Sequence, residues 1–233
     1  MNKTKKGQLF VVSTPIGNMS DFSQRAIDCL KSANIVACED TRRTGLLFSR
    51  LGFKKKLFSY HNFNELKRTP AIIENLNNGN DVALVSDAGT PGISDPAYRV
   101  VRAAVEAGFD VIPVPGPSAV LASLVVSGLP PDRFVFEGFL PPKGAKRLKR
   151  IEAMADEQRT IILFESPHKI LLLLENILSI LGDREISVSR EITKLHEETI
   201  RGNVSIVLEK MIAAKPRGEY TVVIRGREKR KGK

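Results

Sequence analysis

The sequence predicts a protein of two α/β domains. Short apolar runs, several of them rich in β-branched residues, alternate with segments of helical periodicity along almost the whole chain. Loops rich in glycine, proline, serine and aspartate follow four of these runs. A stretch rich in proline and glycine, residues 115–131, separates two halves of different pattern, so we expect the hinge between the domains there.

The first domain, residues 1–115, is expected to form a mainly parallel sheet. Its predicted strands are residues 9–13, 35–38, 56–59, 81–86 and 110–114. Segments 22–30 and 96–107 carry their apolar residues on one helical face. Asp95 and Pro96 suit the cap and the first turn of the second helix. The regular alternation of strands and helices is typical of a parallel sheet.

The second domain, residues 116–226, is expected to contain a mixed sheet. Its predicted strands are residues 134–137, 160–165, 186–191 and 220–225, and its predicted helices are residues 119–127, 147–157, 169–181 and 204–214. Residues 197–201 are expected to pair antiparallel with a neighbouring strand. A basic tail, residues 227–233, completes the chain.

Charge and composition restrict the class of protein. The net charge is +10, and most of the excess lies in residues 3–6 and from residue 225 onward. Such ends are either solvated tails or contacts for a polyanion such as RNA, and charge alone favours neither. No apolar run approaches the ~18 residues of a membrane span, no secretory signal precedes the first strand, and two cysteines make no disulfide framework. The sequence therefore predicts a cytoplasmic protein without a membrane partner.

Several common ligand motifs are absent. Only Gly17 follows the first strand, where the dinucleotide fingerprint has three glycines. The sequence has no P-loop and no Gly-x-Ser-x-Gly elbow, and its histidines and cysteines lack metal-ligand spacing. A nucleotide-hydrolysing site, an ordinary dinucleotide site and a metal site are therefore disfavoured.

The loop at residues 86–96 is the strongest candidate for a ligand site. It holds two glycines, two aspartates and two prolines, and Ile93 is its one bulky side chain. Three more polar loops, residues 13–18, 113–118 and 165–168, also follow predicted strands. Ligands of open α/β sheets bind beyond the carboxyl ends of parallel strands, so these loops are expected to meet around a ligand.

Three motifs give the sequence a family resemblance. They are LFVVSTPIGN at residues 9–18, SDAGTP at 86–91 and PGPSA at 115–119. Over residues 8–226 the chain resembles the tetrapyrrole (corrin/porphyrin) methylases. Four further stretches, CEDTRRT at 38–44, FESPH at 164–168, REITKLHEE at 190–198 and GEYT at 218–221, resemble the branch that methylates a cytidine 2′-hydroxyl in 16S ribosomal RNA.

The resemblance implies a fold and a cofactor. The fold is that of class III methyltransferases, with a cofactor cleft between two α/β domains, and the assembly is a homodimer. The cofactor is S-adenosylmethionine, and the RNA partner is 16S ribosomal RNA within the small ribosomal subunit. By motif, the implied cofactor contacts are Ile16, Asp87, Ala88, Gly89, Thr90, Ser118, Ala119, Phe164, Glu219 and Thr221.

Methyl transfer to a ribose oxygen needs alignment of the reactants and removal of the hydroxyl proton. Asp40 and Lys194 are the candidate catalytic bases, and Lys194 would need a lowered pKa. His61, Glu65 and Glu191 are weaker candidates for the same role. Clustered cations suit phosphate contacts, so RNA binding is expected at Arg42, Arg43 and His196.

Two alternatives stay open. The same fold could methylate carbon atoms of a tetrapyrrole such as a precorrin or uroporphyrinogen, although the Arg42-Arg43 pair and residues 193–196 count against that substrate. The chain could also be an RNA-binding module whose cofactor pocket is vestigial. Binding of S-adenosylmethionine with turnover would exclude the second alternative.

Overall fold

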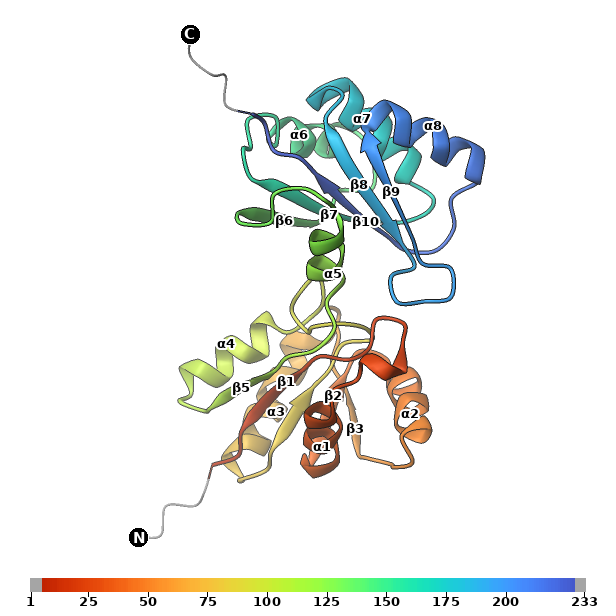
Figure 1. Ribbon diagram of the computed structural model, residues 1–233. Helices are drawn as coiled ribbons and strands as arrows, with labels where there is room; N and C mark the ends of the chain where they lie inside the picture. Colours follow the sequence, from red (N-terminus) through yellow and green to blue (C-terminus); the bar gives the residue numbers. More distant parts are fainter. Residues whose placement is uncertain (1–5, 229–233) are drawn as a thin grey trace. The chain divides into compact units, whose positions relative to one another are not determined.

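The computed structural model describes residues 6–228. The chain divides into two compact units, Met1–Ser118 and Ala119–Lys233, each built of helices around one five-stranded sheet (Figure 1). The predicted α/β class is therefore confirmed. The sequence placed the domain boundary at residue 115, and the two units divide after Ser118. Most of the predicted basic tail, from residue 229 on, lies outside the described residues.

The N-terminal sheet is parallel throughout and has the order β3-β2-β4-β1-β5. Its strands are β1 (Leu9–Val12), β2 (Ile35–Cys38), β3 (Leu57–Ser59), β4 (Val82–Leu84) and β5 (Val111–Val114). The central strands β2 and β4 are buried along their whole length. Strands covered on both faces need continuous apolar runs, and this explains why these segments do not alternate in polarity.

Helices cover both faces of this sheet (Figure 1). One face packs against α1 (Gln24–Ser32) and α2 (Thr41–Arg50), and the other against α3 (Glu65–Asn77) and α4 (Tyr98–Glu106). A short 3₁₀ turn, Met19–Asp21, precedes α1. The sequence patterns did not single out α2 and α3. Pro70 lies inside α3, where it removes one backbone hydrogen bond and obscures the helical pattern.

The predicted helix cap at Asp95 is wrong. Helix α4 begins at Tyr98, its N-cap is Ala97, and no side chain caps it. Asp95 is instead half-buried in the loop before the helix. Because Asp95 does not cap α4, its carboxylate can interact with groups at the neighbouring strand ends.

The C-terminal sheet is mixed and has the order β6-β7-β10-β8-β9. Only β6 (Phe134–Phe139) and β7 (Thr160–Glu165) are parallel. The strands β8 (Glu185–Arg190), β9 (Glu198–Asn203) and β10 (Tyr220–Ile224) pair antiparallel. The antiparallel pairing predicted for residues 197–201 is thus confirmed.

Helices again cover both faces of the C-terminal sheet. On one face lie α6 (Ala145–Glu152), α7 (Ile170–Leu181) and α8 (Val204–Ala214), which share a core cluster with the strands. On the other face α5 (Ala119–Val126) packs through Val120 and Leu124 against Ile162 and Val223. The leucine-rich segment of α7 supplies Leu173 and Leu174, both fully buried, to the first core.

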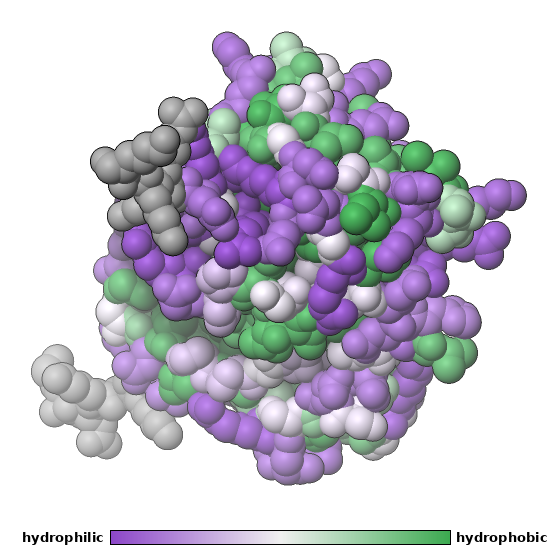
Figure 2. Space-filling model, turned by 45° about the horizontal axis from the view of Figure 1, so that its top comes forward, coloured by the Kyte–Doolittle hydropathy of each residue, from purple (hydrophilic) through white to green (hydrophobic). Residues whose placement is uncertain are grey.

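On the face drawn in Figure 2, hydrophilic residues dominate and hydrophobic side chains gather in patches between them. No helix within residues 6–228 has both the length and the apolar character to span a membrane.

A buried ion pair anchors the end of β7. The side chains of Arg147 and Glu165 are 1% and 4% exposed, and Arg147 Nη2 donates to Glu165 Oε2 at 2.6 Å. Arg147 Nη1 also donates to the carbonyl of Pro141 at 3.1 Å, and Glu165 Oε1 accepts from the backbone N–H of Ser166 at 2.8 Å. One guanidinium thereby joins α6, the loop before it and the carboxyl end of β7.

We expect Arg147→Met to destabilise the C-terminal unit by about 3–5 kcal/mol, because Glu165 would stay buried without a counter-charge. Urea unfolding measures the change. The double variant Arg147→Met, Glu165→Leu should recover much of the loss. Arg150→Met removes an ion pair on the same helix in which the Arg150 side chain is 55% and the Glu137 side chain 18% exposed, so it should cost less, about 1 kcal/mol. Equal losses for Arg147→Met and Arg150→Met would contradict this account.

Candidate functional site

Two strand-end loops of the N-terminal unit are joined by their backbones. Thr14 N–H donates to the carbonyl of Gly89 at 2.9 Å, and Gly89 N–H donates to the carbonyl of Thr14 at 3.1 Å. The hydroxyls of Ser13 and Thr90 lie 2.9 Å apart. Ser86 stabilises the second loop from inside, because its buried hydroxyl donates to the carbonyl of Gly89 at 3.3 Å. The loops predicted to meet therefore do so after β1 and β4.

Glycines make this contact possible. Gly89 has φ +79°, and a Cβ there would lie 3.3 Å from Ile16 Cγ2 and 3.8 Å from the carbonyl oxygen of Pro117. A Cβ at Gly116 would lie 3.0 Å from Ser13 Cβ. The loops after β1, β4 and β5 thus approach so closely that main-chain groups, not bulky side chains, form this end of the sheet.

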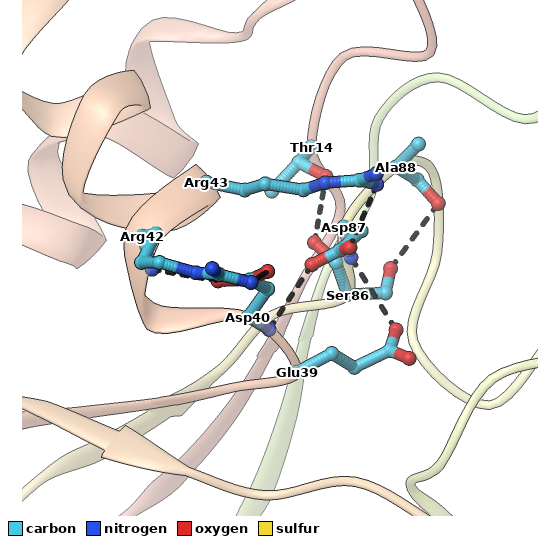
Figure 3. A network of polar contacts seen from close by, with 8 residues as sticks. All are labelled: Thr14, Glu39, Asp40, Arg42, Arg43, Ser86, Asp87 and Ala88. Atoms are coloured by element: carbon cyan, nitrogen blue, oxygen red, sulfur yellow. Dashed lines mark hydrogen bonds and ion pairs between the residues drawn. The ribbon is translucent and has the colours of Figure 1, made fainter.

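Asp87 ties this region to the end of β2 (Figure 3). Its Oδ2 accepts from Arg43 Nη1 at 3.0 Å, and its Oδ1 accepts from the backbone N–H of Asp40 at 3.3 Å. The backbone N–H of Asp87 donates to Glu39 Oε1 at 3.4 Å. The Arg43 side chain is 73% exposed, so this ion pair orients Asp87 more than it stabilises the fold.

Two carboxyl groups in this region resist ionisation. Burial and the neighbouring Glu39 charge, with a further contribution from Asp87, raise the pKa of Asp95 to about 7. Burial also raises the pKa of Glu39 above its usual value, although the hydrogen bond from Asp87 N–H opposes this shift. Neither role was predicted from the sequence, where Glu39 had no assigned function and Asp95 was expected to cap a helix. Their proximity depends on the strand order, which places β2 beside β4.

Asp40, the first candidate base, caps α2. Its Oδ1 accepts from the backbone N–H of Arg42 at 2.8 Å, and its Oδ2 pairs with the Arg42 guanidinium at 2.9 Å. Hydrogen bonds from Arg42 lower the pKa of Asp40 to about 2. A carboxylate held in this way accepts a proton poorly while Arg42 stays in place.

Lys194, the second candidate base, belongs to the C-terminal unit. Its Nζ donates to Glu191 Oε1 at 2.9 Å and to Glu219 Oε2 at 2.8 Å. Burial alone would lower the pKa of Lys194, but the two carboxylates outweigh it and raise the pKa above the usual value. In this arrangement Lys194 is a cation. It forms an ion pair with Glu219, which is a predicted cofactor contact.

The other predicted cofactor contacts fall into two groups. Ile16, the loop from Asp87 to Thr90 and Ser118 belong to the N-terminal unit, whereas Ala119 opens α5 of the C-terminal unit. Phe164 and Thr221 face each other in register on β7 and β10. Phe164 also packs edge-on against Phe136, with ring centroids 4.9 Å apart.

Solved structures of methyltransferases share this fold. The chain matches a cobalt precorrin-4 methyltransferase with a TM-score of 0.67 and 16% identity over 94% of both chains. It matches a uroporphyrin-III C-methyltransferase from Thermus thermophilus with a TM-score of 0.65 and 19% identity, again over 94% of both chains. At these identities the likeness concerns the fold.

Sequence comparison gives the family. Residues 8–207 match the model of the tetrapyrrole (corrin/porphyrin) methylases. The chain belongs to this family of methyltransferases, and its methyl donor is S-adenosylmethionine. Relatives named ribosomal RNA small subunit methyltransferase I include one from Synechocystis sp., 44% identical over 94% of this chain and 79% of the relative. Another, from Thermotoga maritima, is 45% identical over 95% of this chain and all of the relative.

The strand-end site has the chemistry that this cofactor needs. S-adenosylmethionine carries a sulfonium and an ammonium group, and the site holds the carboxyl groups of Glu39, Asp87 and Asp95. Its adenine edge and carboxylate require main-chain partners, and the strand-end loops bring main-chain groups together where Gly89 and Gly116 carry no side chain of their own. The residues present therefore fit the cofactor.

The raised pKa of Asp95 predicts a pH-dependent stability. The carboxyl group has a higher pKa folded than unfolded, so its contribution to stability falls as pH rises from about 4 through about 7. Asp95→Asn keeps the neutral shape and should remove this dependence. At pH 8 we expect the variant to be more stable by about 1–2 kcal/mol, a value discounted for partial solvent screening. Urea unfolding at pH 5 and pH 8 tests this, and parallel pH profiles of the two proteins would refute it.

Proposed function

We propose that this protein transfers a methyl group from S-adenosylmethionine to the 2′-hydroxyl of a cytidine ribose in 16S ribosomal RNA. The observation that carries the proposal is the backbone-lined end of the N-terminal sheet, where Thr14 and Gly89 hold the loops together beside Asp87. The names of the relatives supply the substrate class. The proposed substrate form is the small ribosomal subunit.

Within this proposal, the chain's own residues mainly bind and orient. The cofactor, when bound, supplies the activated methyl group. Asp87 is held by Arg43 and the Asp40 N–H, so its carboxylate keeps one orientation beside the loop. Ile16, Ala88, Thr90, Ser118 and Ala119 remain proposed contacts from the N-terminal strand ends and the start of α5. Phe164, Glu219 and Thr221 remain the proposed contacts from the second sheet.

The proposed proton acceptor must be a group whose pKa suits neutral pH. Asp40 and Lys194 stay our candidates, and each must first leave its ion pair with Arg42 or with Glu191 and Glu219. Asp95, with a pKa of about 7, joins them because it needs no such release. Arg42, Arg43 and His196 are the proposed RNA contacts.

The proposed assembly is a cytoplasmic homodimer. Exposed apolar side chains support an interface, since contiguous patches of this kind mark contact sites. Leu121 and Val125 are 53% and 73% exposed and lie one helical turn apart on α5, so they form one exposed apolar stripe. The large polar surface in Figure 2 suits a protein that works in water.

Asp87→Ala should weaken binding of S-adenosylmethionine at least tenfold and leave the fold intact, because the side chain is partly exposed and belongs to no core cluster. Titration calorimetry measures the affinity, and circular dichroism checks the fold. Glu106→Ala removes an exposed carboxylate on α4 and is the matched control. Unchanged affinity in Asp87→Ala would show that the loop does not hold the cofactor.

The proposed reaction is tested on small subunits and 16S RNA from cells that lack this gene. The purified protein should add one methyl group per RNA, and mass spectrometric mapping should place it on a cytidine ribose. Binding of the cofactor without transfer of a methyl group to either RNA substrate would contradict the proposal. Methylation of a uroporphyrinogen or precorrin under the same conditions would favour the tetrapyrrole alternative instead.

A further inference from the structure

A cationic pocket lies at one end of the C-terminal sheet. It has a volume of about 360 Å³ and is lined by the β8–β9 loop and the connection from α8 to β10, which lie at the same end of the sheet (Figure 1). The residues that line it are Arg190, Glu191, His196, Ala214, Lys215, Arg217 and Gly218. Three are permanent cations and one is a histidine, against a single carboxylate. Of these residues, only His196 was predicted from the sequence to contact RNA.

The one carboxylate that lines the pocket is paired with Lys194, a cation that it shares with Glu219. Glu191 Oε1 accepts from Lys194 Nζ at 2.9 Å and from the backbone N–H of Glu219 at 3.1 Å. The hydrogen bond from Lys194 is the largest cause that lowers the pKa of Glu191, and His196 adds to the shift. Glu191 therefore does not balance the other lining cations.

Two of those cations, Lys215 and Arg217, keep their side-chain donors available among the described residues, whereas Arg190 is already paired with Glu198. Within residues 6–228, neither Lys215 nor Arg217 has a side-chain ion pair or hydrogen bond. Arg190 Nε lies 2.9 Å from Glu198 Oε2, but it lacks hydrogen-bond geometry and is otherwise buried without a partner. A group of unsatisfied guanidinium and ammonium donors around one hollow is what binds a phosphate.

The backbone around the pocket is held in an uncommon shape. Glu191 and Thr193 have φ +48° and +69°, and Lys215 has φ +52°, a conformation that non-glycine residues rarely adopt. Gly218 has φ +81°, and a Cβ there would lie 2.6 Å from the Glu191 side chain. The main chains of the two segments also pair, because Glu191 N–H donates to the carbonyl of Glu219 at 3.1 Å. Strain of this kind persists only where surrounding contacts maintain it, and it concentrates at functional sites.

We propose that this pocket binds a backbone phosphate of the RNA substrate through Arg190, Lys215 and Arg217, with His196 at its rim. The inference rests on the proposed function and adds a site to it. A phosphate contact carries no sequence information but fixes the position of the RNA on the protein. Lys194 lies in the same loop, so RNA held here would also lie beside the candidate catalytic residue.

The test is RNA binding by the double variant Lys215→Gln, Arg217→Gln across a salt series. Each lost phosphate contact lowers the slope of log affinity against log salt by roughly 0.7–0.9, so two lost cations should lower it by about 1 to 2. The affinity for 16S RNA should fall about tenfold at low salt, while the affinity for S-adenosylmethionine stays unchanged. The charge-conserving variant Lys215→Arg, Arg217→Lys should keep the wild-type slope.

The matched control is Lys54→Gln, Lys67→Gln, which removes the same charge from exposed positions of the N-terminal unit outside the pocket. An equal loss of affinity in this control would overturn the inference and indicate a nonspecific charge effect. An unchanged salt slope in the pocket variant would overturn it as well, even if inorganic phosphate binds there. Wild-type methyl transfer to 16S RNA is measured in parallel. If the wild-type protein transfers the methyl group but the pocket variant binds RNA as well as the wild type does, this inference alone is wrong. If the wild-type protein transfers no methyl group, the proposed function is wrong.

Discussion

The two backbone hydrogen bonds between Thr14 and Gly89 are the constraint on which the candidate site depends. They join the loops after two adjacent parallel strands, and they require a residue at position 89 that tolerates φ +79° next to Ile16. Because this contact uses main-chain groups and Gly89 has no Cβ, the two loops can approach closely at the end of the sheet. A ligand can then approach the backbone there, which explains why the loop is rich in small residues.

The carboxyl groups around this backbone contact differ in how readily they ionise. Asp87 is paired with Arg43, Asp40 is held ionised by Arg42, and burial makes Glu39 and Asp95 reluctant to ionise. The result is a group of carboxyl side chains that differ in pKa although they lie on neighbouring strand ends. Such separation is typical of sites that bind a cation and move a proton, because one group can stay charged while another exchanges its proton.

The C-terminal unit uses ion pairs for two different purposes. The buried pair of Arg147 and Glu165 has almost no contact with solvent and joins α6 to β7, so its role is structural. The partly exposed network around Lys194 instead joins the β8–β9 loop to Glu219 and pairs with Glu191 at the edge of the cationic pocket. An ion pair thus stabilises the fold at Arg147, whereas ion pairs influence the charge of the surface at Lys194. The degree of burial decides between these two roles.

The sequence by itself determined the α/β class, most strands and the position of residues 86–91 after a strand, because apolar periodicity and glycine-rich loops are local properties of the chain. Its motifs indicated the family by resemblance. It did not indicate α3, where Pro70 interrupts the pattern, and it misplaced Asp95 as a helix cap. Only the tertiary structure brought Glu39 beside Asp87, since strands β2 and β4 are neighbours in the sheet but distant in sequence. The pKa of Asp95 and the cationic pocket around Arg217 were decided in the same way. Both depend on burial and on charges from separate segments, which no spacing of residues along the chain encodes.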